Sequence, residues 1–397
     1  ALICRRDVAP RTDVLNQFAR FNRLPLVTPL RWSVVYWPPE KAHRFVIILH
    51  QPGGERILPG ADATIDAWRE DRVVRLVLNP LMPVFKELGG RNLTHRAIRA
   101  DNVFFADAGR ESVVLGECFS LPAGMAQPSI YEPIDGAMAM PEGRGHGTPA
   151  DDYYALGVLV LVLLCGGNPV PDLSEAELVE AKISKGSYAA LVGDTRLSLP
   201  MVEMLRGLLC DDPDERWRHD DLQVWLNGRH LSPKQALLPP KAARLFPFDG
   251  EEYNNAAALS YAMGRKWSAG VLEIKSPELE RWIRRSLSDD RKAAAVSAAT
   301  RALSGGSRLR SDGLPTIFRS PAPRAARAAE ATSTSSVPAP PSSGKGSGRT
   351  GGAPKTRVGS PGSIGATPSL KPSLSRCARA DTVITCCSSC TGADSGL

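Results

Sequence analysis

The longest apolar run of the chain, residues 155–165, constrains the fold more strongly than any other feature. It reads Ala-Leu-Gly-Val-Leu-Val-Leu-Val-Leu-Leu-Cys and ends at Gly166-Gly167-Asn168-Pro169. A membrane helix needs about 20 apolar residues, so this run has the length of a core helix. A helix that is apolar on every side must be enclosed by other elements. The sequence therefore predicts a folded domain built around this helix, with no membrane span.

Composition narrows the classes of protein. The 397 residues include 43% hydrophobic residues, enough for a sizeable core and two or three domains. The formal net charge is +7, but the lysines and arginines are scattered rather than grouped, so we expect no nucleic-acid partner. Four cysteines lie far apart in apolar or loop contexts and predict reduced thiols of a cytoplasmic protein: Cys4, Cys118, Cys165 and Cys210. Cys387 and Cys390 form a CxxC without a second pair, so no zinc site is expected.

Local patterns predict the elements before the apolar run. Residues 1–4 read as a strand remnant, and a helix is expected from Thr12 or Asp13 to about Arg23. Strands are expected at 32–37 and 45–49, which are rich in β-branched and aromatic residues. A helix is expected over 73–88, interrupted by Pro80 and Pro83. A short strand is expected at 113–115.

A polar loop precedes a further apolar triplet. It reads His95-Arg96-Ala97-Ile98-Arg99-Ala100-Asp101-Asn102 and runs into Val103-Phe104-Phe105. This loop resembles the catalytic loop of protein kinases, H-R-D-L-x-x-x-N. Four further partial matches follow in the order of that family, at plausible spacings: Glu117-Cys118-Phe119 for D-F-G, Met140-Pro141-Glu142 for A-P-E, Asp152 to Gly157 for the start of the buried central helix, and Asp211 to Arg216 for D-P-x-x-R.

The resemblance implies an α+β, two-lobed kinase-like fold of the serine/threonine, bacterial type. Residues 1–56 would form a partial N-lobe and 57–228 the C-lobe, with the phosphate-covering Gly-rich loop lying before residue 1. A linker, 229–250, would lead to a helical accessory segment, 251–303. The remainder, 304–397, is dominated by Ser, Gly, Pro, Ala and Thr and is expected to be disordered, as a tether, a phosphoacceptor tail or a misread end.

The chemistry expected of a kinase is incomplete in this sequence. Ala97 stands in the place of the catalytic Asp, and a methyl group accepts no proton. Ala1-Leu2-Ile3-Cys4 resembles V-A-I-K with Cys4 in place of Lys, and the next helix offers Asp13 but no Glu. Asp101 is either a weak substitute base or the acidic residue common there in the family. Asn102 and Glu117 are either magnesium ligands or, respectively, a loop amide and a turn residue.

Other matched residues have structural roles in the family. The resemblance implies that His95, Arg96 and Asp152 fix the loop, and that Glu142 and Arg216 form a buried pair. We therefore interpret the chain as a pseudokinase that binds a protein partner not named by the sequence, with weak or no binding of ATP and Mg²⁺. The alternatives are an atypical active serine/threonine protein kinase using Asp101 and Glu117, and a pure scaffold protein.

The accessory segment offers a scaffold surface. Its basic face suits an acidic partner, although a helical cap on the C-lobe explains the pattern as well. Its apolar stripe is expected to meet the lobe or a partner, because a short helix does not bury such a stripe against itself. The stripe comprises Trp267, Val271, Leu272, Leu279, Trp282, Ile283 and Leu287, and the basic face comprises Arg281, Arg284 and Arg285.

Overall fold

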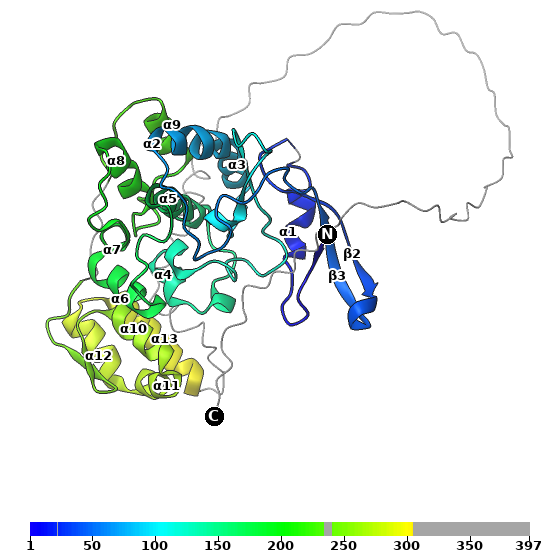
Figure 1. Ribbon diagram of the computed structural model, residues 1–397. Coiled ribbons are helices and arrows are strands. Elements are labelled where there is room, and N and C mark those ends of the chain that lie inside the picture. Colours follow the sequence, from blue (N-terminus) through cyan, green and yellow to red (C-terminus); the bar gives the residue numbers. More distant parts are fainter. Residues whose placement is uncertain (22, 234–239, 305–397) are drawn as a thin grey trace, which may run out of the picture. The chain divides into compact units, whose positions relative to one another are not determined.

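The computed structural model describes residues 1–304, except 22 and 234–239, and these residues form an α+β fold (Figure 1). A small antiparallel sheet lies at the N-terminal end, and helices make up most of the remainder, which confirms the predicted class. The elements of the N-terminal part, residues 1–56, are β1 (Leu2–Ile3), α1 (Thr12–Phe18), β2 (Pro29–Trp37), a 3₁₀ turn (Pro38–Glu40) and β3 (Ala42–Leu49).

The central part, residues 57–228, contains most of the helices. Its elements are α2 (Glu70–Val73), a π turn (Val74–Leu78), α3 (Asn79–Gly90), a 3₁₀ turn (Ala100–Asn102), β4 (Val103–Phe105), β5 (Val113–Leu115), a 3₁₀ turn (Ser129–Tyr131), α4 (Ile134–Met138), a 3₁₀ turn (Pro141–Gly143), α5 (Pro149–Cys165), α6 (Glu175–Lys185), α7 (Ser187–Val192), α8 (Leu199–Leu208) and α9 (His219–Leu226). The elements that follow are β6 (Phe246–Phe248), β7 (Glu251–Tyr253), α10 (Ala256–Arg265), α11 (Trp267–Lys275), α12 (Pro277–Ser286) and α13 (Asp290–Ser304).

The N-terminal sheet has the strand order β1-β3-β2, and each neighbouring pair is antiparallel. β2 and β3 form a long hairpin beside α1 (Figure 1), and they extend beyond both predicted strands. Cys4 and Ile47 face the same core as Leu15 and Phe18 of α1. The helix ends at Phe18 rather than near Arg23, because the chain turns there and buries the Phe21 ring against the Phe18 ring, 5.6 Å away between centroids.

Helix α5 is the buried helix that the apolar run predicts. Every residue from Ala150 to Leu163 is buried, and α2, α3 and α8 pack around it (Figure 1). Thr148 and Asp151 form a capping box at its start, with the Thr148 N–H donating to the Asp151 carboxylate at 2.7 Å. Gly166 ends it with a φ of 77°, a left-handed conformation that glycine adopts without steric cost.

The two prolines near α3 do not break the helix. α2 and α3 are continuous through the π turn, in which the Asn79 N–H donates to the Val74 carbonyl, five residues earlier. This wider turn shifts the hydrogen-bond pattern by one residue immediately before Pro80, which has no N–H to donate. Pro83 lies inside α3 and is tolerated within a helix whose apolar side is buried. The helix therefore continues through the prolines, and the expected interruption is replaced by one wider turn before Pro80.

The short hairpin of β4 and β5 places two polar segments side by side. Val103 pairs with Leu115, and Phe105 pairs with Val113. Leu115 also exchanges hydrogen bonds with the N-terminal part, accepting from the Val27 N–H at 2.8 Å and donating to the Pro25 carbonyl at 2.9 Å. The loop that enters β4 and the segment that leaves β5 are thereby adjacent.

The accessory segment has a hydrophobic core of its own, so the expectation that its stripe could not be buried internally is wrong. Leu279, Trp282 and Ile283 are buried there, whereas Leu272 is 70% exposed. The segment begins before the predicted boundary at residue 251: Phe246 and Phe248, within the predicted linker, form β6 and enter this core. The segment also contacts the central part, where Ala257, Ala258 and Tyr261 pack against Ala137, Val179 and Ile183.

Several sequence expectations concern cysteines, membranes and the tail. The four cysteines within the described residues are free. No helix among these residues is long and apolar enough to cross a membrane. The predicted tail lies outside the described residues, apart from Ser304 at the end of α13.

Packing around α5 gives a stability prediction. A Cβ at Gly157 would lie 2.8 Å from the Leu208 Cβ and 3.1 Å from the Leu209 side chain, and α8 would have to shift. We expect Gly157→Ala to lower the free energy of unfolding by about 1–3 kcal/mol in urea denaturation. Gly264→Ala in α10 is the control, because a Cβ there meets open space and alanine favours the helix. An equal effect of the two substitutions would contradict this packing.

Candidate functional site

The loop over residues 93–102 is fixed by a carboxylate of the central helix. The Asp152 side chain accepts hydrogen bonds from the N–H groups of His95, at 2.6 Å, and Arg96, at 2.8 Å. Arg96 has a φ of 58°, a conformation that costs a non-glycine residue roughly 1–3 kcal/mol and requires such support. Burial raises the pKa of Asp152 to about 6, while these two N–H donors favour its ionised form.

The His95 ring is part of the core rather than a proton carrier. It is fully buried, and its Nε2 lies 3.0 Å from the Gly116 carbonyl oxygen. Burial lowers the pKa of His95 to about 3, so the ring is neutral at neutral pH. The Phe18 ring lies 6.4 Å from it and 5.3 Å from the Phe119 ring, between centroids. His95 thus joins the loop, α1 and the segment after β5.

Ala97 occupies the position that the resemblance to protein kinases assigns to a catalytic base, and its side chain accepts no proton. The Ala97 methyl group belongs to the main hydrophobic core, and its carbonyl accepts a hydrogen bond from Asn102 Nδ2 at 2.8 Å. Asp101 is held by Arg99, with 2.8 Å between Arg99 Nε and Asp101 Oδ1, and both side chains are only 15% exposed. The guanidinium therefore already neutralises the nearest carboxylate of the loop.

Asn102 and Glu117 lie together, but their polar atoms are used within the chain. Asn102 Nδ2 also donates to the Glu117 carbonyl, at 2.9 Å. The Glu117 carboxylate accepts from the N–H groups of Phe119, at 2.7 Å, and Ser120, at 3.0 Å, and from the Ser120 hydroxyl. Glu117 thus closes its own turn. Gly116 permits the approach, because a Cβ there would collide with Asn102 Oδ1.

These residues fit a magnesium ion poorly. Mg²⁺ prefers octahedral oxygen ligands, usually one or two carboxylates with phosphate oxygens and water. Glu117 offers one carboxylate, which already accepts three hydrogen bonds, and Asn102 offers one amide oxygen. Nowhere in residues 1–304, leaving aside 22 and 234–239, do three or more His, Cys, Asp or Glu side chains gather as metal ligands.

Cys4 supplies no positive charge to this site. Its side chain is buried, and burial raises the pKa of its thiol to about 11, with the nearby charge of Glu117 adding to the effect. The thiol is therefore neutral at neutral pH. Asp13 of α1 lies elsewhere: it is exposed and 4.0 Å from the His146 ring. The structure brings Cys4 near Glu117 and leaves Asp13 outside this group.

Arg11 is a residue of this site that the sequence did not reveal. It is buried, and its guanidinium donates to the carbonyls of Thr94, at 3.0 Å, and His95, at 2.9 Å. Its N–H donates to the Phe119 carbonyl at 2.8 Å. Arg11 therefore joins the start of α1 to both polar segments of the site. An arginine just before a predicted helix gives no sequence signal for this role.

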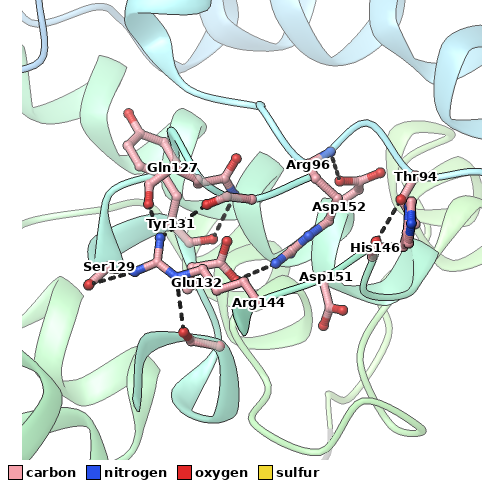
Figure 2. Close-up of polar contacts among 12 residues, drawn as sticks. Thr94, Arg96, Gln127, Ser129, Tyr131, Glu132, Arg144, His146, Asp151 and Asp152 are labelled. Atoms are coloured by element: carbon pink, nitrogen blue, oxygen red, sulfur yellow. Dashed lines mark hydrogen bonds and ion pairs between the residues drawn. The ribbon is translucent and has the colours of Figure 1, made fainter. Parts of the chain in front are cut away.

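A second group of buried charges holds the segment after the site (Figure 2). Arg96 Nη2 lies 2.7 Å from Glu132 Oε2, and both side chains are almost wholly buried. The Arg144 guanidinium donates to the carbonyls of Gly124 and Gly136, each at 3.2 Å, to the Gln127 carbonyl, and to the Ser129 hydroxyl at 3.1 Å. These contacts order residues 124–144, which form only short helical turns.

Lys182 of α6 is a further buried cation of this group, and it contacts the same segment. Its ammonium group donates to the carbonyls of Ser129, Ile130 and Glu132 at 2.9–3.0 Å, and no part of the side chain is exposed. Burial lowers the pKa of Lys182 to about 7. The sequence shows this lysine only as a polar residue of an amphipathic helix.

The structure does not form the expected pair of Glu142 and Arg216. Arg216 is buried and contacts Asp151, with 3.4 Å between Nη1 and Oδ1, together with the carbonyls of Ala150 and Cys210. Glu142 is exposed in a 3₁₀ turn. The carboxylate at the start of α5 takes the partner role because the helix holds it next to the turn that carries Arg216.

With this geometry in view, comparison with known proteins shows a partial similarity to protein kinases. Over 144 residues, 34% of this chain and 40% of the relative, it is 27% identical to calcium/calmodulin-dependent protein kinase type 1 of Caenorhabditis elegans. Over 184 residues, 44% of this chain and 38% of the relative, it is 26% identical to CBL-interacting protein kinase 16 of Oryza sativa subsp. japonica. The chain spans about two fifths of the length of these relatives. No protein-family model matches it.

The corrected pairing can be tested by substitution. Arg216→Ala leaves Asp151 buried without its guanidinium, so we expect the free energy of unfolding to fall by about 3–5 kcal/mol in urea denaturation. Glu142→Ala removes an exposed carboxylate and should change it by no more than about 0.5 kcal/mol. Equal destabilisation by both substitutions would restore the pairing expected from the sequence.

The pKa of Lys182 predicts a pH dependence. The ordinary value is 10.5, so between pH 7 and 10.5 the unfolded chain binds more protons than the folded one. Stability from this group is therefore full above pH 10.5 and lost as the pH falls through about 7. The stability difference between the wild type and Lys182→Met should shift in favour of the wild type as the pH rises through this window.

The control for this measurement is Lys185→Met, which removes an exposed lysine from the same helix. Urea denaturation across the pH range should give a nearly constant difference between wild type and this variant. A constant difference for Lys182→Met as well would show that the buried amine keeps its ordinary pKa.

Proposed function

We propose that this chain is a pseudokinase, a protein-kinase-like domain that transfers no phosphoryl group and acts by binding a protein partner. The partial similarity to two protein kinases supports the kinase-like class. The order of the five motifs in the sequence supports it as well. Fold class alone does not give function, so the proposal depends on the site.

The observation that carries the proposal is the internal use of Asn102 and Glu117. Both donors of the amide point to backbone carbonyls, and the carboxylate closes the turn at Phe119 and Ser120. To bind a metal ion, Glu117 would first have to give up these hydrogen bonds. At the same site, Ala97 offers no base. The residues that remain are therefore occupied in holding the loop.

Phosphoryl transfer depends on positioning and on charge stabilisation. Bound ATP and Mg²⁺ would supply the phosphoryl group and neutralise its charge. Cys4 contributes a neutral thiol where the phosphates need a cation. The loss of cation and base together removes several orders of magnitude in rate, and at most weak nucleotide binding remains.

The alternative of an active kinase requires Asp101 to accept a proton. Its carboxylate is held in an ion pair with the Arg99 guanidinium, 2.8 Å away, and would have to leave this pair to reach a substrate hydroxyl. Glu117 would also have to leave its turn. The scaffold alternative relies on the basic face of α12, but Arg281 and Arg284 are already paired with Glu278 and Glu280. Both alternatives therefore need groups that are engaged elsewhere.

Retention of the structural contacts favours a binding role. Asp152 and Arg11 keep the loop rigid without performing chemistry. A rigid surface loses little conformational entropy when a partner binds, which favours affinity. We place the protein in the cytoplasm, because all four cysteines within the described residues are unpaired and largely buried.

Incubation with radiolabelled ATP, Mg²⁺ and a generic basic protein substrate tests the proposal. We expect no incorporation above a protein-free blank and no rise in melting temperature on addition of ATP with Mg²⁺. Ala97→Asp is the matched variant and should also remain inactive, because Asn102 and Glu117 stay engaged. Turnover within about a hundredfold of ordinary kinases, roughly 1–100 per second, would overturn the proposal.

A further inference from the structure

β2 is an edge strand with exposed apolar side chains on both of its faces. It pairs with β3 on one side, and no other strand in the described part of the chain pairs with it. Successive side chains of a strand point to opposite faces, so Val34 and Tyr36 lie on one face and Val35 on the other. Their exposed fractions are 60%, 55% and 39%, respectively. A partner that lies against one face alone would leave the apolar side chains of the other face in water.

The exposed apolar residues of the molecule are concentrated on this hairpin. Ten large apolar side chains are exposed within the described residues, and half of them belong to β2 or β3. Single exposed apolar residues are normal on soluble proteins, whereas a contiguous group marks an interaction surface. The group on the hairpin comprises Leu30, Val34, Val35, Tyr36 and Ile48.

The edge of β2 lacks the features that usually prevent a strand edge from pairing. Exposed edges of natural sheets commonly carry lysines, prolines or bulges. In β2 the irregularity lies at the start, between Pro29 and Arg31, and the prolines at 38 and 39 follow the end of the strand. The stretch between them, residues 30–37, contains one charged side chain, that of Arg31. Its backbone N–H and C=O groups that face away from β3 can therefore pair with a further strand.

One face of β2 is complementary to itself when two copies of the strand run antiparallel about Val34. Trp32 then lies opposite Tyr36 of the second copy, and Val34 lies opposite its own equivalent. Aromatic and β-branched pairs directly opposite each other stabilise a sheet. Trp32 is half-buried because it also packs against the main core, so its ring is already held in place. This face would thus gain three apolar pairs.

The other face of β2 pairs in the same register without a clash of charges. Arg31 lies opposite Trp37 of the second copy, where a guanidinium is attracted to the face of an indole ring. The two copies of Arg31 lie at opposite ends of the paired stretch. Arg44 of β3 also lies on this face, next to Val35, but it is 10% exposed and its Nη1 is 2.8 Å from Glu40. Like charges are therefore kept apart.

We propose that β2 pairs antiparallel with β2 of a second copy of this chain, about a twofold axis at Val34. The two sheets would become one continuous sheet of order β1-β3-β2-β2-β3-β1. Such a contact is self-complementary, as a twofold dimer requires. It satisfies the backbone groups of the edge and covers apolar side chains on both faces. The inference goes beyond the proposed function and does not rest on it, because β2 is separate from the loop over residues 93–102.

Sedimentation velocity of the full chain over a wide range of concentration tests this association. We expect a monomer–dimer equilibrium. Val34→Lys should raise the Kd of the dimer at least about tenfold, which corresponds to about 1.4 kcal/mol, because it places two like charges directly opposite each other. Leu272→Lys is the matched control. It adds the same charge at an exposed apolar side chain of α11 and should leave the Kd unchanged.

Cysteine cross-linking of the full chain tests the register. Replacing the four cysteines beyond residue 304 by serine first removes other sites of cross-linking. Val34→Cys places two cysteines opposite each other, within the Cα separation of about 4.4–6.8 Å that a disulfide spans. Ser33→Cys is the control, because residue 33 lies opposite residue 35 of the second copy and the two new thiols are out of reach. We expect covalent dimers on oxidation of the Val34→Cys variant only.

Each result has a defined meaning. A monomer at every concentration overturns the proposal, and so does equal weakening by both lysine substitutions or equal cross-linking at positions 33 and 34. A monomer whose β2 amides exchange slowly with deuterium also overturns it, since another segment of the same chain would then cover the edge. Binding of a monomer to anionic vesicles that Val34→Lys abolishes would assign the hairpin to a membrane surface and overturn it as well. None of these outcomes depends on the test of phosphotransfer.

Discussion

The two hydrogen bonds that Asp152 accepts from consecutive N–H groups determine the geometry of the loop that enters β4. They support the positive φ of Arg96, and this backbone conformation directs the neighbouring groups. The His95 carbonyl then faces Arg11, the Arg96 guanidinium reaches Glu132, and the Ala97 carbonyl meets Asn102. Asp152 itself belongs to α5, a helix with buried residues on every side. The apolar packing of this helix therefore fixes the position of the carboxylate that holds the loop.

The buried cations of this chain share a pattern of contact. Arg11, Arg144, Lys182 and Arg216 donate mainly to backbone carbonyls, most of them outside regular helices and strands, rather than to carboxylates. Carbonyls outside helices and sheets lack regular partners, and leaving them unpaired in the interior is costly. A multidentate cation satisfies several at once. The segment between β5 and α5 is therefore ordered by side chains, where regular hydrogen bonding is scarce.

The sequence was most informative where one physical requirement dominates. The run over residues 155–165 had to be an enclosed helix, and the residues around the hairpin of β2 and β3 had strong strand preferences; both features are present. The prolines of α3 led to the wrong prediction of an interrupted helix. Helix propensity does not anticipate a π turn, which shifts the backbone hydrogen bonds by one residue before Pro80. The apolar stripe of the accessory segment was also misjudged, since several helices and a hairpin bury it together.

The candidate site was predictable in its components and less so in its contacts. The sequence located the loop and the alanine at position 97, because these depend on residue identity at given spacings. It did not reveal Arg11, Glu132, Arg144 or Lys182, because their roles depend on the approach of distant backbone carbonyls. It also assigned Glu142 to Arg216, because the short motif D-P-x-x-R gives no information on which of several nearby acidic groups is buried.

The hydrogen bonds that Asn102 donates have a consequence for how an asparagine at this position is interpreted. A side chain that ties together the carbonyls of residues 97 and 117 holds the loop in place, and this role needs no phosphoryl transfer. The glycine at 116 is locked in by the same contact, because a larger residue would displace the amide. An asparagine at this position therefore reports on the architecture of the loop, and its presence alone does not indicate catalysis.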